Sequence, residues 1–243
     1  MSHTIVSQNE WLEARKSLLA REKEFTRARD ALSAKRREMP WVKVDKPYVF
    51  DGPDGRETLA DLFGGHSQLI VYHFMLGPGW VQGCPSCSYL ADHFDGVIPH
   101  LAQRDVAMLA VSRAPLAEIE AYKKRMGWQF EWMSSNGNDF NHDFGVSFTK
   151  DETENGAVYN YAKGKIPSEE LPGLSVFAKD KGAVFHTYST YARGLDIIVG
   201  TYNLLDMVPK GRDEDSLPWS MAWVKRHDEY EQAPMAKASC CCG

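Results

Sequence analysis

The sequence carries little net charge and has no long apolar run. Its 28 Lys and Arg residues against 33 Asp and Glu residues give a formal net charge of -5. A weakly negative chain lacks the basic character that gives broad affinity for nucleic acid or for an anionic membrane surface. No stretch is apolar for long enough to span a bilayer, and the N-terminus has no basic segment leading into an apolar signal core. We therefore expect a cytoplasmic protein with neither a nucleic-acid nor a membrane partner.

Cysteine is also scarce, with five residues in a chain of 243. Two of them form a Cys-x-x-Cys motif at Cys84 and Cys87, and the other three are neighbours at positions 240–242. Because cytoplasmic thiols are kept mostly reduced, a purely structural disulfide is not expected there. A disulfide that forms and breaks during a reaction cycle fits that compartment.

The motif follows an apolar run at residues 69–76, which has the composition of a central strand buried on both faces. If Pro85 takes the first helical position, Cys84 becomes the N-cap of the next helix. Its sulfur would then face unpaired backbone N–H groups and the positive end of the helix dipole, which favour the thiolate. Cys87, one turn further along, could close a bond with Cys84 and expel a substrate from a mixed disulfide. The alternatives are half of a zinc site or two inert core thiols.

The N-terminal segment predicts a long amphipathic helix. Residues 8–38 contain no Gly or Pro and place four apolar residues at steps of seven, namely Trp11, Leu18, Phe25 and Leu32. Ser7 or Asn9 can cap its start. We expect residues 1–40 to form an extension whose apolar stripe packs within the same chain, with a homodimer through this helix as the alternative.

From residue 41 the pattern changes to alternating strands and helices. The order is a strand at 69–76, a helix over Leu90 to Leu101, a strand at 106–111, a helix at 115–126 and a half-buried strand at 128–132. It predicts a parallel α/β arrangement, completed by an antiparallel hairpin at 174–188 and a helix at 195–205. The main domain would span residues 41–210, with an insertion at about 151–165, followed by a C-terminal extension with a Cys-rich tail at 211–243.

This order resembles the thioredoxin superfamily, in which a Cys-x-x-Cys opens the first helix after a central strand. The segment from Phe50 to Phe63 is similar to the entry segment of the peroxiredoxin-type branch. Further segments together resemble the bacterial family catalogued as domain of unknown function 899, whose members are described only as predicted dithiol-disulfide oxidoreductases; these are residues 83–88, 144–146, 172–177, 192–196 and 223–230. The resemblance covers nearly the whole chain to Tyr230. It implies a thioredoxin-like fold of the peroxiredoxin-type branch, with a central mixed sheet flanked by helices and an N-terminal helical extension.

The resemblance also implies residue roles around the dithiol. In thioredoxin-like folds a cis-proline faces the two cysteines, and Pro172 is the matching position. Pro172 and Pro85 would then shape the substrate groove. A trans proline in a turn next to Gly173 is the alternative.

Acid–base chemistry is where the sequence departs from these families. The Pro and Thr that precede a peroxidatic Cys in peroxiredoxins are absent upstream of Cys84, so a thiol peroxidase is the weaker enzymatic interpretation. The buried carboxylate that helps to deprotonate the second Cys of thioredoxins has no clear counterpart. His73 is one candidate base, although a hydrogen-bonded core role is favoured for a His in an apolar strand. Arg113 should lie at the same sheet edge as Cys84, where it could steady a thiolate, bind an acidic substrate or simply face solvent.

The three tail cysteines, Cys240, Cys241 and Cys242, allow three hypotheses. They could supply an extra resolving or relay thiol, ligate a soft metal together with Cys84 and Cys87, or belong to a disordered end.

Together these patterns predict a thiol-disulfide oxidoreductase with Cys84 as nucleophile and Cys87 as resolving thiol. Its substrate would be a protein or small-molecule disulfide and its reductant an unidentified thiol. We assign no metal, and no organic cofactor is expected because the Gly-rich pieces lack dinucleotide-binding spacing. The alternative from another class is a non-catalytic thioredoxin-like binding module whose dithiol holds a metal or which recruits a partner.

Overall fold

The computed structural model describes residues 3–231, which fall into two compact units divided between Trp41 and Val42. The predicted boundary after residue 40 differs by one residue. Residues 211–231, expected as a separate extension, belong to the larger unit.

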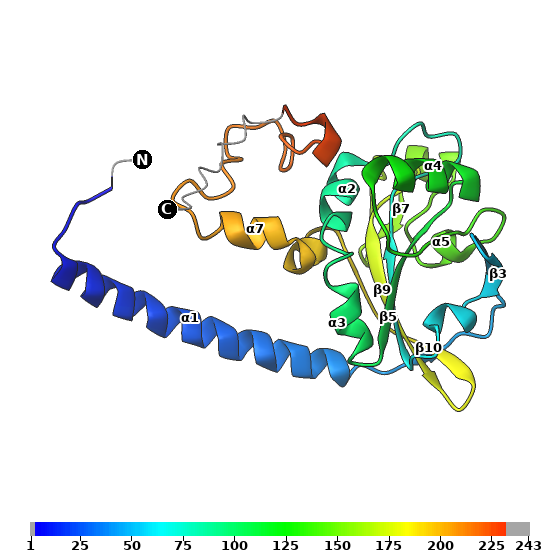
Figure 1. Cartoon of the computed structure of the whole chain (residues 1–243), viewed down its shortest axis with the longest axis horizontal. Helices are drawn as coiled ribbons and strands as arrows, with labels where there is room; N and C mark the ends of the chain where they lie inside the picture. The colour runs from blue at the N-terminus through cyan, green and yellow to red at the C-terminus, as the bar shows by residue number, and fades with distance from the viewer. Residues whose placement is uncertain (1–2, 232–243) are drawn as a thin grey trace, which may run out of the picture. The chain divides into compact units, whose positions relative to one another are not determined.

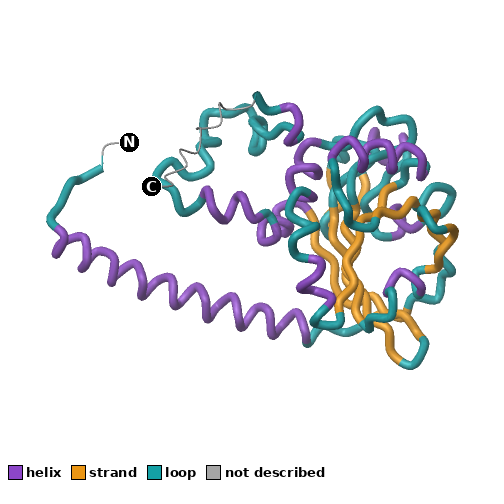
Figure 2. The backbone as a smooth tube through the Cα atoms, in the orientation of Figure 1, coloured by secondary structure: helices purple, strands orange, loops and turns teal. Residues whose placement is uncertain are grey.

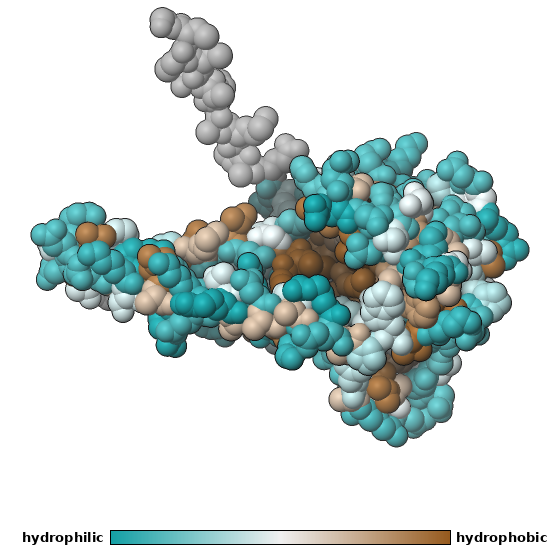
Figure 3. Space-filling model, turned by 90° about the horizontal axis from the view of Figure 1, so that it is seen from below, coloured by the Kyte–Doolittle hydropathy of each residue, from teal (hydrophilic) through white to brown (hydrophobic). Residues whose placement is uncertain are grey.

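The smaller unit is one long helix, α1 (Gln8–Arg37). A capping box begins it, since the Ser7 hydroxyl accepts from the Glu10 N–H while the Glu10 carboxylate accepts from the Ser7 N–H. None of its residues is buried, and the four apolar residues at steps of seven are each more than half exposed. Figure 3 shows hydrophobic side chains standing singly among hydrophilic ones along this helix. The expectation that this apolar stripe packs within the same chain, and the alternative that it joins two copies of the chain, both stay predictions.

The larger unit is built on an eight-stranded mixed sheet with the order β1-β10-β9-β4-β5-β6-β2-β3 (Figures 1 and 2). Its central strand β4 is parallel to β5 and antiparallel to β9. A separate pair, β7 and β8, forms a small hairpin. The strands are β1 (Val42–Lys43), β2 (Val49–Gly52), β3 (Gly55–Thr58), β4 (Gln68–His73), β5 (Val106–Ser112), β6 (Trp132–Ser134), β7 (Ala157–Tyr159), β8 (Ala162–Gly164), β9 (Gly173–Asp180) and β10 (Ala183–Tyr191).

Helices cover both faces of this sheet, with α2 on one side and α5 on the other (Figure 1). The α-helices of this unit are α2 (Pro85–Ala91), α3 (Ile98–Ala102), α4 (Leu116–Met126), α5 (Phe140–Asp143), α6 (Lys150–Asn155) and α7 (Gly200–Leu205). Short 3-10 turns are η1 (Asp61–Phe63), η2 (Ala192–Ile198) and η3 (His227–Glu229).

Strand β4 separates two apolar cores because its residues alternate between the faces. Tyr72 packs into the core that contains Cys87 and residues of α2, α4 and α7. Leu69 and Val71 pack into the other core, with residues of η1 and α5. A central strand that leads to the dithiol helix, a parallel neighbour and an antiparallel hairpin on the other side make up a thioredoxin-like fold. The predicted fold class is confirmed.

Two predicted elements differ in extent. The helix expected to reach Leu101 is split into α2 and α3, where Gly96 and Pro99 favour a break. The strand expected at 128–132 keeps its alternating burial, but only Trp132–Ser134 joins the sheet. The N–H groups of Gln129 and Phe130 donate instead to the carboxylate of Asp95, which lies in the break between the two helices.

The segment expected as an insertion contains α6 followed by the β7–β8 hairpin. Its tyrosines reach back to the main sheet, where the Tyr161 hydroxyl donates to the Ser189 carbonyl over 3.0 Å. The hairpin is therefore a packed part of the larger unit.

Candidate functional site

Cys84 is the N-cap of α2, as its sequence context predicts. Pro85 takes the first helical position, and the Cys84 carbonyl accepts from the Ser88 N–H at 3.0 Å and from the Ser88 hydroxyl at 2.9 Å. Cys84 is partly exposed, whereas Cys87 is buried one turn further on. Only the first thiol can meet a partner directly.

The residue before the motif must be glycine. A Cβ at Gly83 would lie 2.5 Å from the Phe74 ring and 2.8 Å from the Tyr122 ring. The chain therefore enters the helix in close contact with two aromatic side chains, and a larger residue would force these rings or the backbone at residue 83 to shift.

A buried arginine from the C-terminal segment holds the same residue. Arg226 donates from Nε and Nη2 to the Gly83 carbonyl, over 3.0 Å and 2.6 Å, and its Nη1 pairs with Glu229 at 3.0 Å. Its side chain is only 9% exposed, so its charge acts close to the dithiol with little screening by water. Sequence reasoning missed this residue. In the sequence, Arg226 is marked only by its position within residues 223–230, one of the segments that resemble domain of unknown function 899.

The two thiols are electrostatically unequal. Hydrogen bonding from the Cys87 thiol is the largest cause that lowers the pKa of Cys84 to about 6, helped by the N–H groups of Cys87 and Ser86 and by the positive charge of Arg226, while burial opposes it. Burial raises the pKa of Cys87 well above its usual value, and the neighbouring Cys84 raises it further. At neutral pH this arrangement makes Cys84 the thiolate and leaves the proton on Cys87.

Tyr72 is the second residue that sequence reasoning missed. Its hydroxyl contacts the Cys87 sulfur, and it is 1% exposed. Burial, followed by the charge of Cys87, raises the pKa of Tyr72 well above 10.0. The phenol therefore remains neutral and can donate a hydrogen bond to a Cys87 thiolate.

His73, the candidate base from the sequence, lies away from the dithiol. Alternation along β4 turns its ring to the other core, where it stacks on Phe144 with ring centroids 5.9 Å apart. Its Nε2 lies 2.8 Å from the Ser175 hydroxyl, which agrees with the favoured hydrogen-bonded core role. Burial lowers the pKa of His73 to about 3, so the ring is neutral at physiological pH. The β4 side chain that packs in the same core as Cys87 is Tyr72, so the alternative role of His73 as a base for Cys87 is wrong.

The peptide bond before Pro172 is trans, which corrects the expected cis form; residues 3–231 contain no cis peptide bond. The chain here runs extended into β9 and is fixed on both sides. The Leu171 N–H donates to the Val146 carbonyl at 2.8 Å, and the Pro172 carbonyl accepts from the Tyr159 hydroxyl at 2.7 Å. Pro172 still lies beside the dithiol, lining the same pocket as both cysteines.

Arg113 forms an ion pair with a buried carboxylate, that of Glu170. Its Nε lies 2.6 Å from Glu170, whose other carboxylate oxygen accepts from the Ser147 hydroxyl at 2.5 Å. Burial raises the pKa of Glu170, and the charge of Arg113 counters that effect. Arg113 therefore acts as the partner of Glu170. The charge that lowers the pKa of Cys84 comes from Arg226.

A pocket of about 320 Å³ opens beside the two thiols, and we call it the dithiol pocket. Cys84, Cys87, Tyr72 and Pro172 line it together. The rest of its wall is largely apolar and comes from α2, η2, α7 and two loops, through Met75, Leu90, Leu195, Val199, Tyr202 and Met221.

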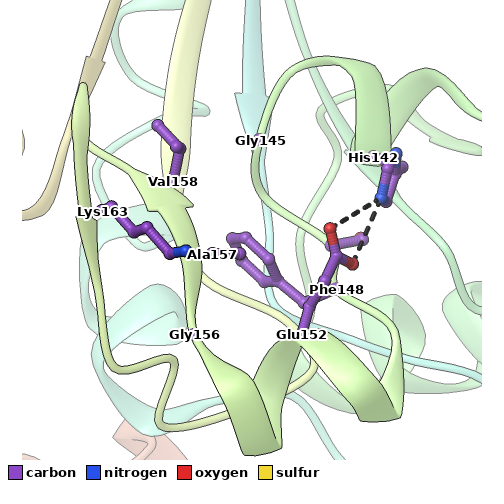
Figure 4. A pocket seen from close by; sticks show the side chains of 9 residues that line it. His142, Gly145, Phe148, Glu152, Gly156, Ala157, Val158 and Lys163 are labelled. Atoms are coloured by element: carbon purple, nitrogen blue, oxygen red, sulfur yellow. Dashed lines mark hydrogen bonds and ion pairs between the residues drawn. The ribbon is translucent and has the colours of Figure 1, made fainter.

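A second cavity, of about 380 Å³, lies at the β7–β8 hairpin (Figure 4). His142 Nε2 lies 3.3 Å from both carboxylate oxygens of Glu152 on one side, and Lys163 lines the other. Neither cysteine of the motif lines it. Both cysteines of the motif line the dithiol pocket instead.

Several expectations concern metals, membranes or the tail. Within residues 3–231 there is no group of three or more His, Cys, Asp or Glu side chains placed to hold a metal ion. None of the helices in the same range has the length and apolar character to cross a membrane. Cys240, Cys241 and Cys242 lie outside the described residues, so their three hypotheses stay open.

Comparison with known proteins gives structural neighbours and a family. Peroxiredoxin Q from Xanthomonas campestris is 13% identical, with 68% of this chain and 98% of that chain covered and a TM-score of 0.47. PrxQ from Xylella fastidiosa is 12% identical, covering 68% and 94% with a TM-score of 0.44. Peroxidoxin BcpB from Mycobacterium tuberculosis is 13% identical, covering 67% and 95% with a TM-score of 0.44. No curated protein matches the chain. The sequence model described as "Bacterial protein of unknown function (DUF899)" matches residues 1–230, so the chain belongs to this bacterial family.

Proposed function

We propose that this protein is a dithiol-disulfide oxidoreductase in which Cys84 attacks and Cys87 resolves. One observation carries the proposal: a partly exposed Cys84 caps the N-terminus of α2 and a buried Cys87 lies one turn further along. This geometry lowers the pKa of Cys84 and raises that of Cys87. Such a pair supplies a nucleophile near neutral pH and holds a second thiol in reserve.

The reaction has two balanced steps. The Cys84 thiolate attacks one sulfur of a disulfide, a bond forms between these two sulfurs, and the other substrate sulfur leaves as a thiolate that takes a proton from water. Cys87 then gives its proton to water, and the resulting thiolate attacks Cys84. This attack closes the Cys84–Cys87 disulfide and releases the second substrate thiolate, which takes a proton from water. Counted from the form with Cys84 ionised and Cys87 protonated, the protein loses two electrons and one proton. The solvent supplies the second proton, and the substrate disulfide becomes two thiols. An external thiol reductant returns the protein to its dithiol form.

The local electrostatics support this order of events. While Cys84 is a thiolate, its charge and hydrogen bonding raise the pKa of Cys87. Once Cys84 is bonded to substrate that negative charge is gone, so the same environment no longer opposes ionisation of Cys87 as strongly. The Tyr72 hydroxyl can then donate to the newly formed thiolate. The resolving thiol becomes reactive only when it is needed.

A stoichiometric assay tests the proposal on a background in which Cys240, Cys241 and Cys242 are replaced by Ser. The pre-reduced protein is mixed with 5,5'-dithiobis(2-nitrobenzoate), and release of thionitrobenzoate is followed. The parent should release two equivalents in two phases and end unlabelled, whereas Cys87→Ser should release one equivalent and keep a label on Cys84. Cys84→Ser should lose the fast phase. Equal rates for Cys84→Ser and the parent would refute the proposal, and bound stoichiometric zinc without Cys84-dependent exchange would favour the binding-module alternative.

A further inference from the structure

The wall of the dithiol pocket opposite the thiols is built to receive an apolar group. Leu195 and Val199, from the segment that leads into α7, are almost fully buried and face the same space as Cys84. Met221 closes another side and is held by a hydrogen bond of 3.0 Å from its N–H to Glu214. A volume of about 320 Å³ lies at the small end of the range for ligand pockets and suits a short alkyl chain or a single ring.

The charged residues lining the pocket already have partners. Asp196 accepts from Arg193 and from Arg212, each at 3.1 Å. Arg193 is also largely exposed to water, so its charge is screened. A substrate with several charges, such as glutathione disulfide, would lose hydration here and find its counter-charges engaged. A neutral substrate avoids that cost.

The backbone beside Pro172 is also occupied from within the chain. The Tyr159 hydroxyl donates to the Pro172 carbonyl at 2.7 Å and accepts from the Ala192 N–H at 3.1 Å. The Leu171 N–H already donates to Val146, and Pro172 has no N–H to offer. An extended peptide needs main-chain partners along such an edge. At this edge two such main-chain groups, the Pro172 carbonyl and the Ala192 N–H, are already hydrogen-bonded to Tyr159 of the β7–β8 hairpin.

From these three features we infer that the dithiol pocket binds an apolar group attached directly to a disulfide sulfur, so that the substrate class is small, neutral alkyl or aryl disulfides. This inference rests on the proposed function and deepens it. Cys84 attacks the sulfur that carries the apolar group, the other sulfur leaves as a thiolate, and Cys87 then releases the apolar thiol as described above. The pocket holds that group through both steps, until the apolar thiol departs.

A homologous series of probes tests the inference on the tail-serine background. The probes are mixed disulfides of thionitrobenzoate with methanethiol, butanethiol and glutathione, which all release the same chromophore. The single-turnover rate of each probe with the protein is divided by the rate at which the same probe reacts with dithiothreitol. This ratio removes differences in the intrinsic reactivity of the probes. Burial of one methylene contributes about fourfold, so the three methylenes that separate butyl from methyl should give about 60-fold. The glutathione probe should react no faster than the methyl probe.

Substitutions in the pocket wall separate binding from general reactivity. Val199→Phe should fill the pocket and reduce the butyl advantage to a few-fold, with the rate of Cys84 alkylation by iodoacetamide in the same variant as the reference for its intrinsic reactivity. Val199→Thr, which keeps the shape and adds a hydroxyl, covers the case in which the larger side chain prevents folding, and it should reduce the advantage several-fold. Val184→Thr is the matched control, because Val184 is equally apolar and buried but belongs to the other core. It should keep the full butyl advantage.

The outcomes of the two proposals can be told apart. Equal normalised rates for butyl and methyl, or a glutathione probe faster than the butyl probe, would overturn the substrate class while leaving disulfide exchange intact. An equal loss of the butyl advantage in Val199→Thr and Val184→Thr would also overturn it, because the effect would then be one of stability. Failure of every probe to react at Cys84 would instead contradict the proposed function itself.

Discussion

Replacing Cys87 by Ala or by Ser should separate its hydrogen bond from its sulfur. The hydrogen bond from the Cys87 thiol is the largest cause of the lowered pKa of Cys84. Serine keeps a donor at this position and alanine removes it. Both variants lack the resolving thiol, so neither can form the internal disulfide during the measurement.

The expected size of the effect follows from the strength of one charged hydrogen bond. Such a bond contributes about 1.5–3 kcal/mol, which corresponds to roughly one to two pKa units. The pKa of Cys84, about 6 in the parent, should therefore stay close to that value in Cys87→Ser and rise by roughly one to two units in Cys87→Ala. Because a more basic thiolate is also intrinsically more nucleophilic, rates at a single pH would understate this shift. The pH midpoint is the quantity to compare.

The assay is alkylation of Cys84 by iodoacetamide over a pH series, quantified on the peptide that contains Cys84 so that the tail cysteines do not interfere. Thermal unfolding of both variants serves as the control for folding. The expected result is a midpoint for Cys87→Ala clearly above those of Cys87→Ser and the parent. A common midpoint for the two variants would refute the assigned cause, and a parent midpoint near that of free cysteine would refute the electrostatic account of the site.

Three other substitutions test neighbouring groups. Tyr72→Phe removes the hydroxyl that donates to Cys87. The second phase of thionitrobenzoate release should slow by about 10- to 100-fold, which corresponds to the loss of one charged hydrogen bond, and the first phase should not change. Slowing of the first phase alone would contradict the role of this hydroxyl. Arg226→Met removes the charge beside the Gly83 carbonyl and should raise the alkylation midpoint of Cys84, whereas an unchanged midpoint in a folded variant would exclude that charge as a cause. His73→Phe should keep the stacking on Phe144 and lose the hydrogen bond to Ser175, lowering the free energy of unfolding by about 1 kcal/mol in denaturant titrations. Its Cys84 midpoint should not move, and a shift would mean that His73 does influence the dithiol.

The sequence was informative where the cause is local. The N-cap position of Cys84 follows from Pro85 and from the strand before it, because both signals lie within a few residues of the motif. The cap of α1 and the α/β order are predictable for the same reason. Local spacing therefore placed both cysteines of the motif correctly, with Cys84 at the start of α2 and Cys87 one turn further along.

The residues that surround the dithiol could not be predicted from local sequence patterns. A strand buried on both faces shows no alternation of polar and apolar residues, so nothing in residues 69–76 indicates that Tyr72 rather than His73 faces the thiols. Arg226 reaches Gly83 across 143 positions of sequence, and Tyr159 reaches the site from an insertion. The trans bond at Pro172 depends on contacts with Val146 and with that insertion, which no local pattern records.

The most direct test of the central claim maps the bonds formed when the full-length, pre-reduced protein meets one equivalent of a small disulfide. Peptide mass spectrometry should find the Cys84–Cys87 disulfide in the parent, and in Cys87→Ser a mixed disulfide on Cys84. A label carried mainly by Cys240, Cys241 or Cys242, with Cys84 still reduced, would contradict the account.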